Sequence, residues 1–376
     1  MLKTKGAVLW GVNEDWKIEE IDLGDPVPGE VQVRLAASGM CHSDEHVRTG
    51  DTVLPSFPFL GGHEGAGIVT KVGPGVNTLQ EGDHVVLAFI PACGRCPSCS
   101  NGQQNLCDFG ANLLTGVSIA DGTLRHTVNG QGAIPMCLLG TFSPYVTVHE
   151  SSAIKIDDDI PLDKAALVGC GVTTGWGSSV YAAEVMPGDT VVVIGIGGVG
   201  ANAVQGAKAA GAKRIIAIDP VEFKREQAMV FGATHTFSSM AEALEPLTEI
   251  TWGRGAEKAI ITVGRIEGTQ IAEMMAMVGK GGTGVVTGMG GMADIDVSLS
   301  LFELTLLQKR LQGAVFGAAN PRVEIPKLLG LYREGQLKLD ELITNTYKLE
   351  DVNQGYADMA AGKNIRGVIM YGEEDY

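Results

Sequence analysis

The stretch 190–204 constrains the fold more than any other part of the chain. It joins a β-branched apolar run to a G-x-G-x-x-G turn and then to a helix-forming segment. In this arrangement Gly195 permits the tight turn, Gly197 lets the backbone approach a ligand, and Gly200 allows the helix and strand to pack closely. Because the strand, turn and helix occur together, the motif predicts a dinucleotide-binding unit.

The residues around the turn suit a pyrophosphate and a ribose. A helix that begins at Gly198 and Val199 would present free N–H groups and its positive dipole end to phosphate. Asp219 closes the next apolar run, where its carboxylate could accept hydrogen bonds from both adenosine ribose hydroxyls. The same charge would repel a 2′-phosphate, which favours NAD over NADP, and Lys224 could also reach the ribose.

Apolar strands alternate with helical stretches between about residues 172 and 316. The expected strands are 190–195, 214–219, 234–237, 258–263, 283–288 and 311–316, with helices near 198–210, 221–231, 240–250, 266–278 and 300–309. Strands without polar alternation are buried on both faces. The pattern predicts an α/β fold with a doubly wound parallel sheet.

The first 170 residues follow a different pattern, with short extended runs joined by Gly and Pro turns. Expected strands include 31–35, 67–72, 84–89 and 145–148, and little helical periodicity is visible before about residue 162. After residue 316 the alternation ends at Gly317, Asn320 and Pro321. A helix and a strand near 366–371 follow, and we expect this last segment to return to the first domain.

Four cysteines in one short loop form the strongest chemical signal, in the pattern Cys93-x2-Cys96-x2-Cys99-x7-Cys107. Four thiolates can surround one tetrahedral ion and leave no open position, so the site is expected to be structural. An iron–sulfur cluster is the rival, since C-x2-C-x2-C also opens ferredoxin loops. The spacing of the fourth cysteine and the lack of a following proline favour zinc.

A second set of candidate ligands is scattered along the chain. Cys41 follows a strand, His63 lies in a glycine turn, and Cys170 lies between two glycines near the domain junction. A lone Cys commonly packs as a small core residue, and that is our reading of Cys137. Two thiolates and one imidazole would leave zinc an open fourth position, as a catalytic site requires.

The net charge and the cysteine pattern indicate the cellular compartment and limit the kinds of binding partner that we expect. The formal net charge of −16 disfavours nucleic acid and anionic membrane as partners. No apolar run is long enough for an export signal or a membrane span. The chain has seven cysteines, an odd number, and four of them lie in one loop at the spacing of metal ligands. This pattern indicates metal binding in a reducing, cytoplasmic compartment.

These residues resemble the zinc-dependent, medium-chain alcohol dehydrogenases over nearly the whole chain. The matching stretches are Cys41–His46, Gly62–Glu64, the four-cysteine loop, Cys170–Gly175, Gly195–Gly200 and Ile365–Arg366. The resemblance implies a GroES-like, β-rich catalytic domain formed by residues 1–171 and 317–376. A Rossmann dinucleotide-binding domain, residues 172–316, is inserted between them. It also implies a homodimer or homotetramer assembled through the dinucleotide domain.

The resemblance also implies roles for individual residues. Cys41, His63 and Cys170 would hold a catalytic Zn²⁺, and Cys93, Cys96, Cys99 and Cys107 a structural Zn²⁺. Asp44 would fix the tautomer of His63, Glu64 would lie close behind the metal, and Ser43 and His46 would form a proton relay. His42 and Arg366 would contact the pyrophosphate of NAD(H), while Thr174 and Phe89 would line the nicotinamide and substrate pocket.

The chain is further similar to an actinobacterial subgroup of this family, through Lys3–Gly6, Trp10 and Ser38–His46. Enzymes of that subgroup hold NAD(H) without releasing it, recycle it with a nitrosoaniline dye and are associated with the redox carrier mycofactocin. The resemblance therefore implies a bound cofactor and a redox carrier as partner, in addition to the small-molecule substrate.

The expected activity is zinc-dependent interconversion of alcohols and aldehydes or ketones, with hydride transfer to and from NAD. Three alternatives remain open at this point: a glutathione-dependent formaldehyde dehydrogenase, a zinc-free quinone reductase or structural relative, and a non-catalytic zinc or redox sensor. Retention of all seven ligand positions disfavours the second, and Asp219 together with the scattered ligands disfavours the third. The preferred alcohol and the direction of flux do not follow from the sequence.

Overall fold

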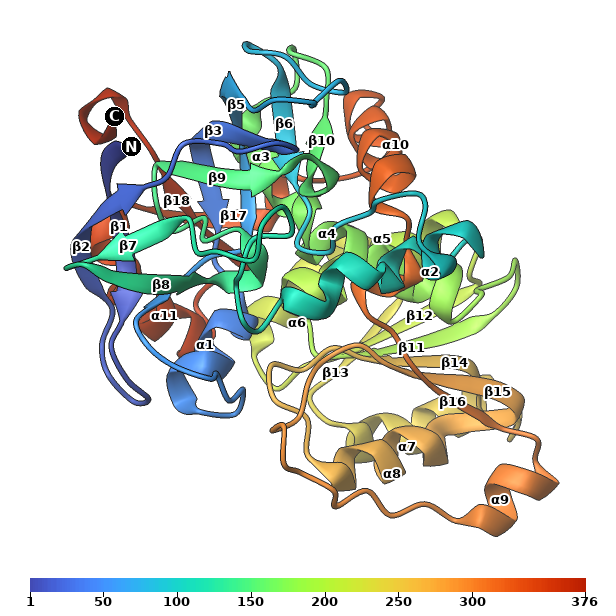
Figure 1. The fold of residues 1–376 in the computed structure, drawn as a ribbon. Helices are drawn as coiled ribbons and strands as arrows, with labels where there is room; N and C mark the ends of the chain where they lie inside the picture. The colour runs from blue at the N-terminus through green and yellow to red at the C-terminus, as the bar shows by residue number, and fades with distance from the viewer. The chain divides into compact units, whose positions relative to one another are not determined.

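The computed structural model describes residues 1–376, which divide into two compact units. Unit 1 contains Met1–Cys170 and Asn320–Tyr376, whereas unit 2 is the continuous stretch Gly171–Ala319. Unit 2 is therefore inserted between the two segments that build unit 1. Both chain ends lie in unit 1 (Figure 1), where Lys5 forms an ion pair with Asp375 at 2.8 Å.

Unit 1 consists mainly of β-structure. Its strands are β1 (Leu2–Leu9), β2 (Lys17–Leu23), β3 (Glu30–Gly39), β4 (Phe59–Leu60), β5 (Glu64–Val72), β6 (His84–Leu87), β7 (His126–Val128), β8 (Gln131–Pro135), β9 (Tyr145–His149), β10 (Ala153–Lys155), β17 (Ile343–Tyr347) and β18 (Arg366–Met370). Strands β1, β2, β7, β8 and β4 close a small barrel. A second sheet has the order β10-β6-β5-β3-β18-β17, and β9 also pairs with β3.

The C-terminal segment completes this second sheet. Strand β18 pairs antiparallel with the end of β3, placing Val368 opposite Gly39 and Ile369 opposite Ser38. Strand β17 then pairs parallel with β18. The end of β3, where the first candidate metal ligand follows, is thus held by residues from the far end of the chain.

The helices of unit 1 are α1 (His42–Thr49), α2 (Pro97–Ser100), α3 (Leu162–Ala166), α10 (Pro321–Arg333) and α11 (Val352–Ala360). The expectation of little helix before residue 162 missed α1. This helix buries only Asp44, His46 and Val47, two of which are polar. The apolar periodicity that normally reveals a helix is absent because its buried face carries polar side chains.

Unit 2 contains one six-stranded sheet in which every strand pairing is parallel. The strands are β11 (Thr190–Ile194), β12 (Arg214–Ile218), β13 (His235–Phe237), β14 (Ala256–Ile261), β15 (Val278–Val286) and β16 (Arg310–Gly313), in the order β13-β12-β11-β14-β15-β16. The helices are α4 (Gly171–Gly177), α5 (Gly198–Ala209), α6 (Glu222–Phe231), α7 (Met240–Ile250), α8 (Gly268–Met277) and α9 (Leu301–Leu306). The predicted doubly wound parallel sheet is confirmed.

Helices cover both faces of this sheet (Figure 1), with α5 on one side and α7 and α8 on the other. The second face forms a continuous core in which alternate strand residues, such as Val192 and Ile194, pack with Leu247 of α7 and Met274 of α8. Because the strands are parallel, their carboxyl ends all meet at one edge. The glycine turn that follows β11 therefore lies at the same edge as Asp219, which follows β12. None of the helices has the length and apolar character needed to cross a bilayer.

An aromatic cluster anchors the core of unit 1. Trp16 stacks on Tyr356 with ring centroids 5.9 Å apart, and it meets Phe142 edge-on at 5.6 Å. Phe59 completes the group, 6.1 Å from Trp16. All four side chains are buried. The cluster joins the N-terminal strands to α11, so residues from both segments of unit 1 share one core.

Candidate functional site

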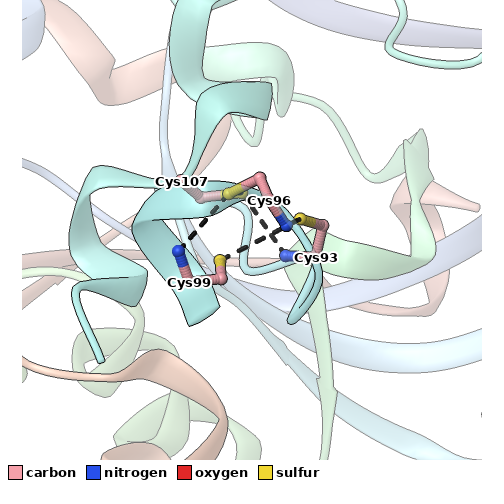
Figure 2. Close-up of side chains that lie close together, drawn as sticks. All are labelled: Cys93, Cys96, Cys99 and Cys107. Carbon is pink, nitrogen blue, oxygen red and sulfur yellow. Dashed lines mark hydrogen bonds between the residues drawn. The ribbon is translucent and has the colours of Figure 1, made fainter. Parts of the chain in front are cut away.

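The four cysteines of the loop 93–107 turn their sulfurs toward one another (Figure 2). The Sγ atoms of Cys93 and Cys99 lie 3.9 Å apart, and those of Cys96 and Cys107 lie 4.0 Å apart. A tetrahedral zinc with bonds of about 2.3 Å to sulfur requires sulfurs roughly 3.8 Å from one another. The donor atoms and their spacing therefore fit a four-thiolate zinc site.

Backbone N–H groups support these sulfurs as thiolates. Arg95 and Cys96 donate to the Cys93 sulfur at 3.5 and 3.3 Å. Cys99 and Asp108 donate to the Cys96 sulfur at 3.4 and 3.5 Å. Burial opposes the charged form of Cys93, but the N–H groups of Arg95 and Cys96 outweigh it and lower its pKa to about 7. Cys93 is thus prepared to hold negative charge, the form that binds metal, whereas burial raises the pKa of the Cys107 thiol to about 12.

The scattered ligand candidates also converge. Cys41, His63 and Cys170, together with Glu64, place their donor atoms within 4.8 Å of one another, and all four residues are buried. Cys41 follows β3, His63 precedes β5, and Cys170 follows a short 3-10 turn. The Cys170 thiol is hydrogen-bonded to Cys41 and holds the pKa of Cys41 well below its usual value. This donor set of two sulfurs and one imidazole fits a divalent zinc ion.

Asp44 fixes the orientation of the histidine in this cluster. Its Oδ2 lies 3.1 Å from Nδ1 of His63, and its Oδ1 accepts the N–H of Gly62 at 2.7 Å. Burial opposes protonation of His63, yet the negative charges of Asp44 and Cys41 raise its pKa well above the usual value. Because Nδ1 faces Asp44, Nε2 remains for the metal. This is the usual arrangement of a carboxylate behind a metal-binding histidine.

Glu64 forms a buried ion pair with Arg366 of β18. The other carboxylate oxygen, Oε1, has no hydrogen-bond partner, and neither has Nε of Arg366. A side chain at Gly39 would collide with both groups, so the close approach requires glycine at that position. Burial raises the pKa of Glu64, while the Arg366 charge opposes this shift. Glu64 therefore presents one unsatisfied oxygen within the ligand cluster.

Helix α1 carries the residues expected to move a proton. Ser43 is partly exposed, and its Oγ lies 3.6 Å from the Cys41 sulfur. His46 is buried, with Nδ1 3.5 Å from a carboxylate oxygen of Asp51. His42 is exposed at the first position of the helix. One short helix thus brings the hydroxyl close to a metal ligand and the imidazole close to a partly exposed acid.

In unit 2 the glycine turn has the geometry that the motif requires. Gly195 has φ of 88°, and a side chain there would meet the backbone of Val263. A side chain at Gly200 would collide with the carbonyl oxygen of Gly195. At Gly197, by contrast, a Cβ atom would meet nothing within 4 Å. Protein packing therefore does not explain Gly197, which borders open space at the start of α5.

Asp219 closes the turn from the neighbouring strand. Its Oδ2 accepts the N–H of Ile196 at 2.8 Å, and its Oδ1 accepts the N–H of Val221 at 2.9 Å. Lys224 is partly buried on α6, and Thr174 on α4 is buried with a hydroxyl that has no hydrogen-bond partner. The carboxylate is held rigidly at the edge where a ribose would bind.

Comparison with known proteins identifies both halves of the chain. Residues 27–158 match the family described as "Alcohol dehydrogenase GroES-like domain", and residues 198–334 match "Zinc-binding dehydrogenase". "Alcohol dehydrogenase B" of Mycobacterium tuberculosis is 54% identical over 374 residues, which cover 100% of each chain. The chain belongs to the zinc-binding alcohol dehydrogenase family.

Two further relatives refine this placement within the alcohol dehydrogenases. An "NDMA-dependent alcohol dehydrogenase" of Amycolatopsis methanolica is 50% identical over 370 residues, covering 98% of this chain and 99% of the relative. The crystal structure of benzyl alcohol dehydrogenase from Acinetobacter calcoaceticus superposes with a TM-score of 0.91 at 30% identity, over 99% and 100% of the two chains. These comparisons confirm the predicted GroES-like and Rossmann architecture. They also confirm the resemblance to the dye-dependent subgroup.

The structure adds one residue that sequence reasoning did not connect with the site. Tyr356 donates a hydrogen bond to the backbone of Cys41. It belongs to no motif, and only the fold brings it to the ligands. Cys137, by contrast, packs against the core of unit 1, and burial raises the pKa of its thiol to about 12. The ring of Phe89 lies edge-on to that of His63, with the ring centroids 5.8 Å apart.

Proposed function

We propose that this protein interconverts alcohols and aldehydes or ketones, using a catalytic zinc held by Cys41, His63 and Cys170 and a bound NAD(H). The single observation that carries the proposal is the convergence of these three side chains from distant parts of unit 1. When bound there, zinc would supply a Lewis acid that makes an alcohol hydroxyl more acidic. NAD would supply the hydride acceptor.

The chain's own residues have separate tasks in this proposal. Asp44 holds His63 in the tautomer whose Nε2 faces the cluster. Ser43 Oγ accepts the proton of the substrate hydroxyl and passes a proton on toward His46. The imidazole of His46 then delivers it toward Asp51, whose side chain is 22% exposed and reaches solvent. Phe89, beside His63, would present an apolar surface to the substrate.

The four-cysteine loop is proposed to hold a second, structural zinc through Cys93, Cys96, Cys99 and Cys107. All four positions of a tetrahedral ion would be filled, so this site would take no part in the reaction. All seven cysteines are free thiols, and six of them lie in the two ligand clusters. This usage supports a reducing, cytoplasmic location.

The cofactor is proposed to be NAD rather than NADP, bound at the glycine turn. The backbone N–H groups of Gly198, Val199 and Gly200 would face its pyrophosphate, with His42 and Arg366 as further contacts. Asp219 would accept from the ribose hydroxyls, with Lys224 nearby, and Thr174 would face the nicotinamide. The unpartnered hydroxyl of Thr174 supports a polar ligand at that position.

We further propose that the cofactor stays bound through the catalytic cycle and is reoxidised in place by a redox carrier. The support is the 50% identity to an NDMA-dependent relative. Denaturing the purified protein and assaying the supernatant tests this directly. One nicotinamide dinucleotide per chain is expected. An empty supernatant, together with turnover on added NAD, would show an ordinary dehydrogenase with exchangeable cofactor.

The dehydrogenase assignment itself is tested by Cys41→Ser, with Cys137→Ser as matched control. Removing one of two sulfur ligands should lower the zinc content from two per chain to one and abolish alcohol oxidation. The control removes a thiol that belongs to neither ligand cluster, so both zincs should remain. Unchanged turnover in Cys41→Ser would reject the proposal.

An assembly through unit 2 is proposed on the basis of its exposed apolar residues. Leu301, Phe302 and Leu306 of α9 are 66–74% exposed, and Ile295 is 96% exposed. The neighbouring strand β16 lies at the edge of the six-stranded sheet. Exposed apolar surface of this kind typically marks an interface. We therefore propose a homodimer or homotetramer in which this surface, residues 295–306 with β16, is covered by a second copy.

A further inference from the structure

Tyr356 reaches a candidate metal ligand from the far end of the chain. Its hydroxyl donates a hydrogen bond to the carbonyl oxygen of Cys41 at 3.3 Å, across 315 positions of sequence. Tyr356 is 5% exposed, so this bond is shielded from water. Cys41 stands at the start of α1, but its side chain makes no capping hydrogen bond. The sulfur is left for the ligand cluster, and the backbone is held by the tyrosine.

Packing fixes the position of this hydroxyl. The Tyr356 ring stacks on Trp16 with an interplanar angle of 18°, and it meets Phe142 at a centroid distance of 6.3 Å. Aromatic rings held on two sides cannot tilt without disturbing the core. The hydroxyl therefore acts as a rigid support rather than as a mobile side-chain end.

The same C-terminal segment also holds the residue before Cys41. The N–H of Met40 donates to the carbonyl oxygen of Gly367 at 3.0 Å. The end of the Met40 side chain lies so close to Gly355 that a Cβ atom there would meet it at 2.5 Å. Residues 355–367 thus hold the backbone at two points, the N–H of Met40 before the ligand and the carbonyl oxygen of Cys41 after it.

We propose that Tyr356 is a positioning residue for the catalytic metal, acting through the backbone of Cys41; this rests on the zinc site of the proposed function. A sulfur ligand can bind only if its Cα atom stands at the right distance from the other ligands. Groups that support metal ligands typically contribute 10- to 100-fold to metal affinity. The tyrosine hydroxyl contributes such support, which a phenylalanine ring in the same place would lack.

The test compares zinc release from the purified holoprotein and from Tyr356→Phe. An excess of a chromogenic chelator is added, and the release of both zincs is followed in time. Cys41→Ser, which lacks the catalytic zinc, identifies the phase that belongs to the four-cysteine loop. In Tyr356→Phe the catalytic zinc should leave about tenfold faster. The structural zinc should leave at the unchanged rate, which makes it an internal control.

Tyr347→Phe is the matched control variant. The Tyr347 hydroxyl bonds to Asp358 of α11 at 3.0 Å, so its loss loosens the same helix without removing a contact to a ligand. Release of both zincs should be unaffected in this variant. If the catalytic zinc leaves equally faster from both variants, the effect comes from the placement of α11. If both zincs leave faster, the protein as a whole has been loosened.

The remaining outcomes also separate the two proposals. Two zincs per chain in the unaltered protein, with no faster release in Tyr356→Phe, would overturn only the role of Tyr356. Failure of Tyr356→Phe to fold would make its hydroxyl a structural group and likewise overturn that role. Absence of the catalytic zinc from the unaltered protein would overturn the proposed function and this inference with it.

Discussion

His126 is buried in β7, and neither of its ring nitrogens has a hydrogen-bond partner. It lines a small cavity of about 20 Å³ together with Glu30, Arg125 and Ser152. Burial, assisted by the positive charge of Arg125, lowers the pKa of His126 to about 4. The folded protein therefore keeps this imidazole neutral at pH values where an unfolded chain would protonate it.

This histidine should make stability depend on pH in the mildly acidic range. Between its ordinary pKa of about 6.5 and the folded value of about 4, the unfolded state binds more protons, so the free energy of unfolding falls as the pH falls. The full effect is about 3 kcal/mol. Urea unfolding of the protein and of His126→Gln, measured from pH 7 to pH 4, should show a shallower loss in the variant. Parallel curves would contradict the assignment.

Asp219 should decide between the two nicotinamide cofactors. Asn is the suitable replacement, because its carbonyl oxygen can keep one of the two backbone hydrogen bonds to Ile196 and Val221. Removing the charge should weaken NAD binding about tenfold to a hundredfold, the range expected for hydrogen bonds to a charged group. Titration of cofactor-free protein measures both affinities. The NADP affinity should rise, and an unchanged ratio of the two would place the ribose elsewhere.

For individual residues, the sequence predicted the metal ligands better than the residues that hold those ligands in place. Cysteines spaced by two residues within one loop are a local sign of a metal site, and in the structure the four sulfurs lie close together. Cys41, His63 and Cys170 could be joined only through a family resemblance, because no spacing links them. Tyr356 could not be predicted, since its contact with Cys41 depends on how α11 packs against the aromatic cluster.

The four-cysteine loop is an element whose structure would depend on the proposed zinc. Between Cys93 and Cys107 the helices are a single turn of α2 and a short 3-10 turn, and the loop's backbone amides point at sulfur. Few apolar side chains are available to replace the ion. In structural zinc sites, the free energy of metal binding contributes to the free energy of folding.

Cys107→Ala should therefore cost both metal and stability. One of the two zincs should be lost, and the thermal midpoint should fall by roughly 10 °C, which corresponds to about 3–4 kcal/mol for a unit of this size. Zinc analysis and differential scanning calorimetry measure the two effects. The control Cys137→Ala should keep both zincs. A Cys107→Ala protein that still holds two would show that this loop is not a zinc site.

Elements with apolar periodicity were predicted well, and polar ones were not. The strands of unit 2 fall close to their predicted positions, because central strands such as β11 and β12 are runs rich in Val and Ile. Helix α1 was missed, since two of its three buried residues, Asp44 and His46, are polar. A helix whose buried face is polar is a candidate for a functional site, but this face can be recognised only once the helix is known.

The surface formed by residues 295–306 and β16 gives a prediction for the whole molecule. Phe302→Glu places a charge on a side chain that is 74% exposed and proposed to be covered by a second copy. The mass measured by light scattering should fall toward that of one chain, because a buried unpaired charge costs several kcal/mol. Met186→Glu, at another exposed apolar position of unit 2, should leave the mass unchanged. Identical masses for both variants would place the interface elsewhere.

Whole-molecule organisation was only partly accessible from the sequence. The alternating pattern located the dinucleotide unit, because buried parallel strands and crossover helices alternate there. The two other segments carry no local sign that they share one sheet. Pairing of β18 with β3 joins residues from opposite ends of the chain, and short-range patterns do not encode such contacts.

The insertion of one unit inside the other also imposes an order on events at the ribosome. Residues 171–319 leave the exit tunnel as an uninterrupted stretch and can fold while translation continues. The first unit cannot close until β18, which pairs with the end of β3, has been made. Until Arg366 arrives, Glu64 lacks the cation that balances its charge in the finished protein. A nascent chain arrested before that point would carry a folded nucleotide-binding unit beside an open sheet, which is the kind of surface that chaperones and proteases recognise.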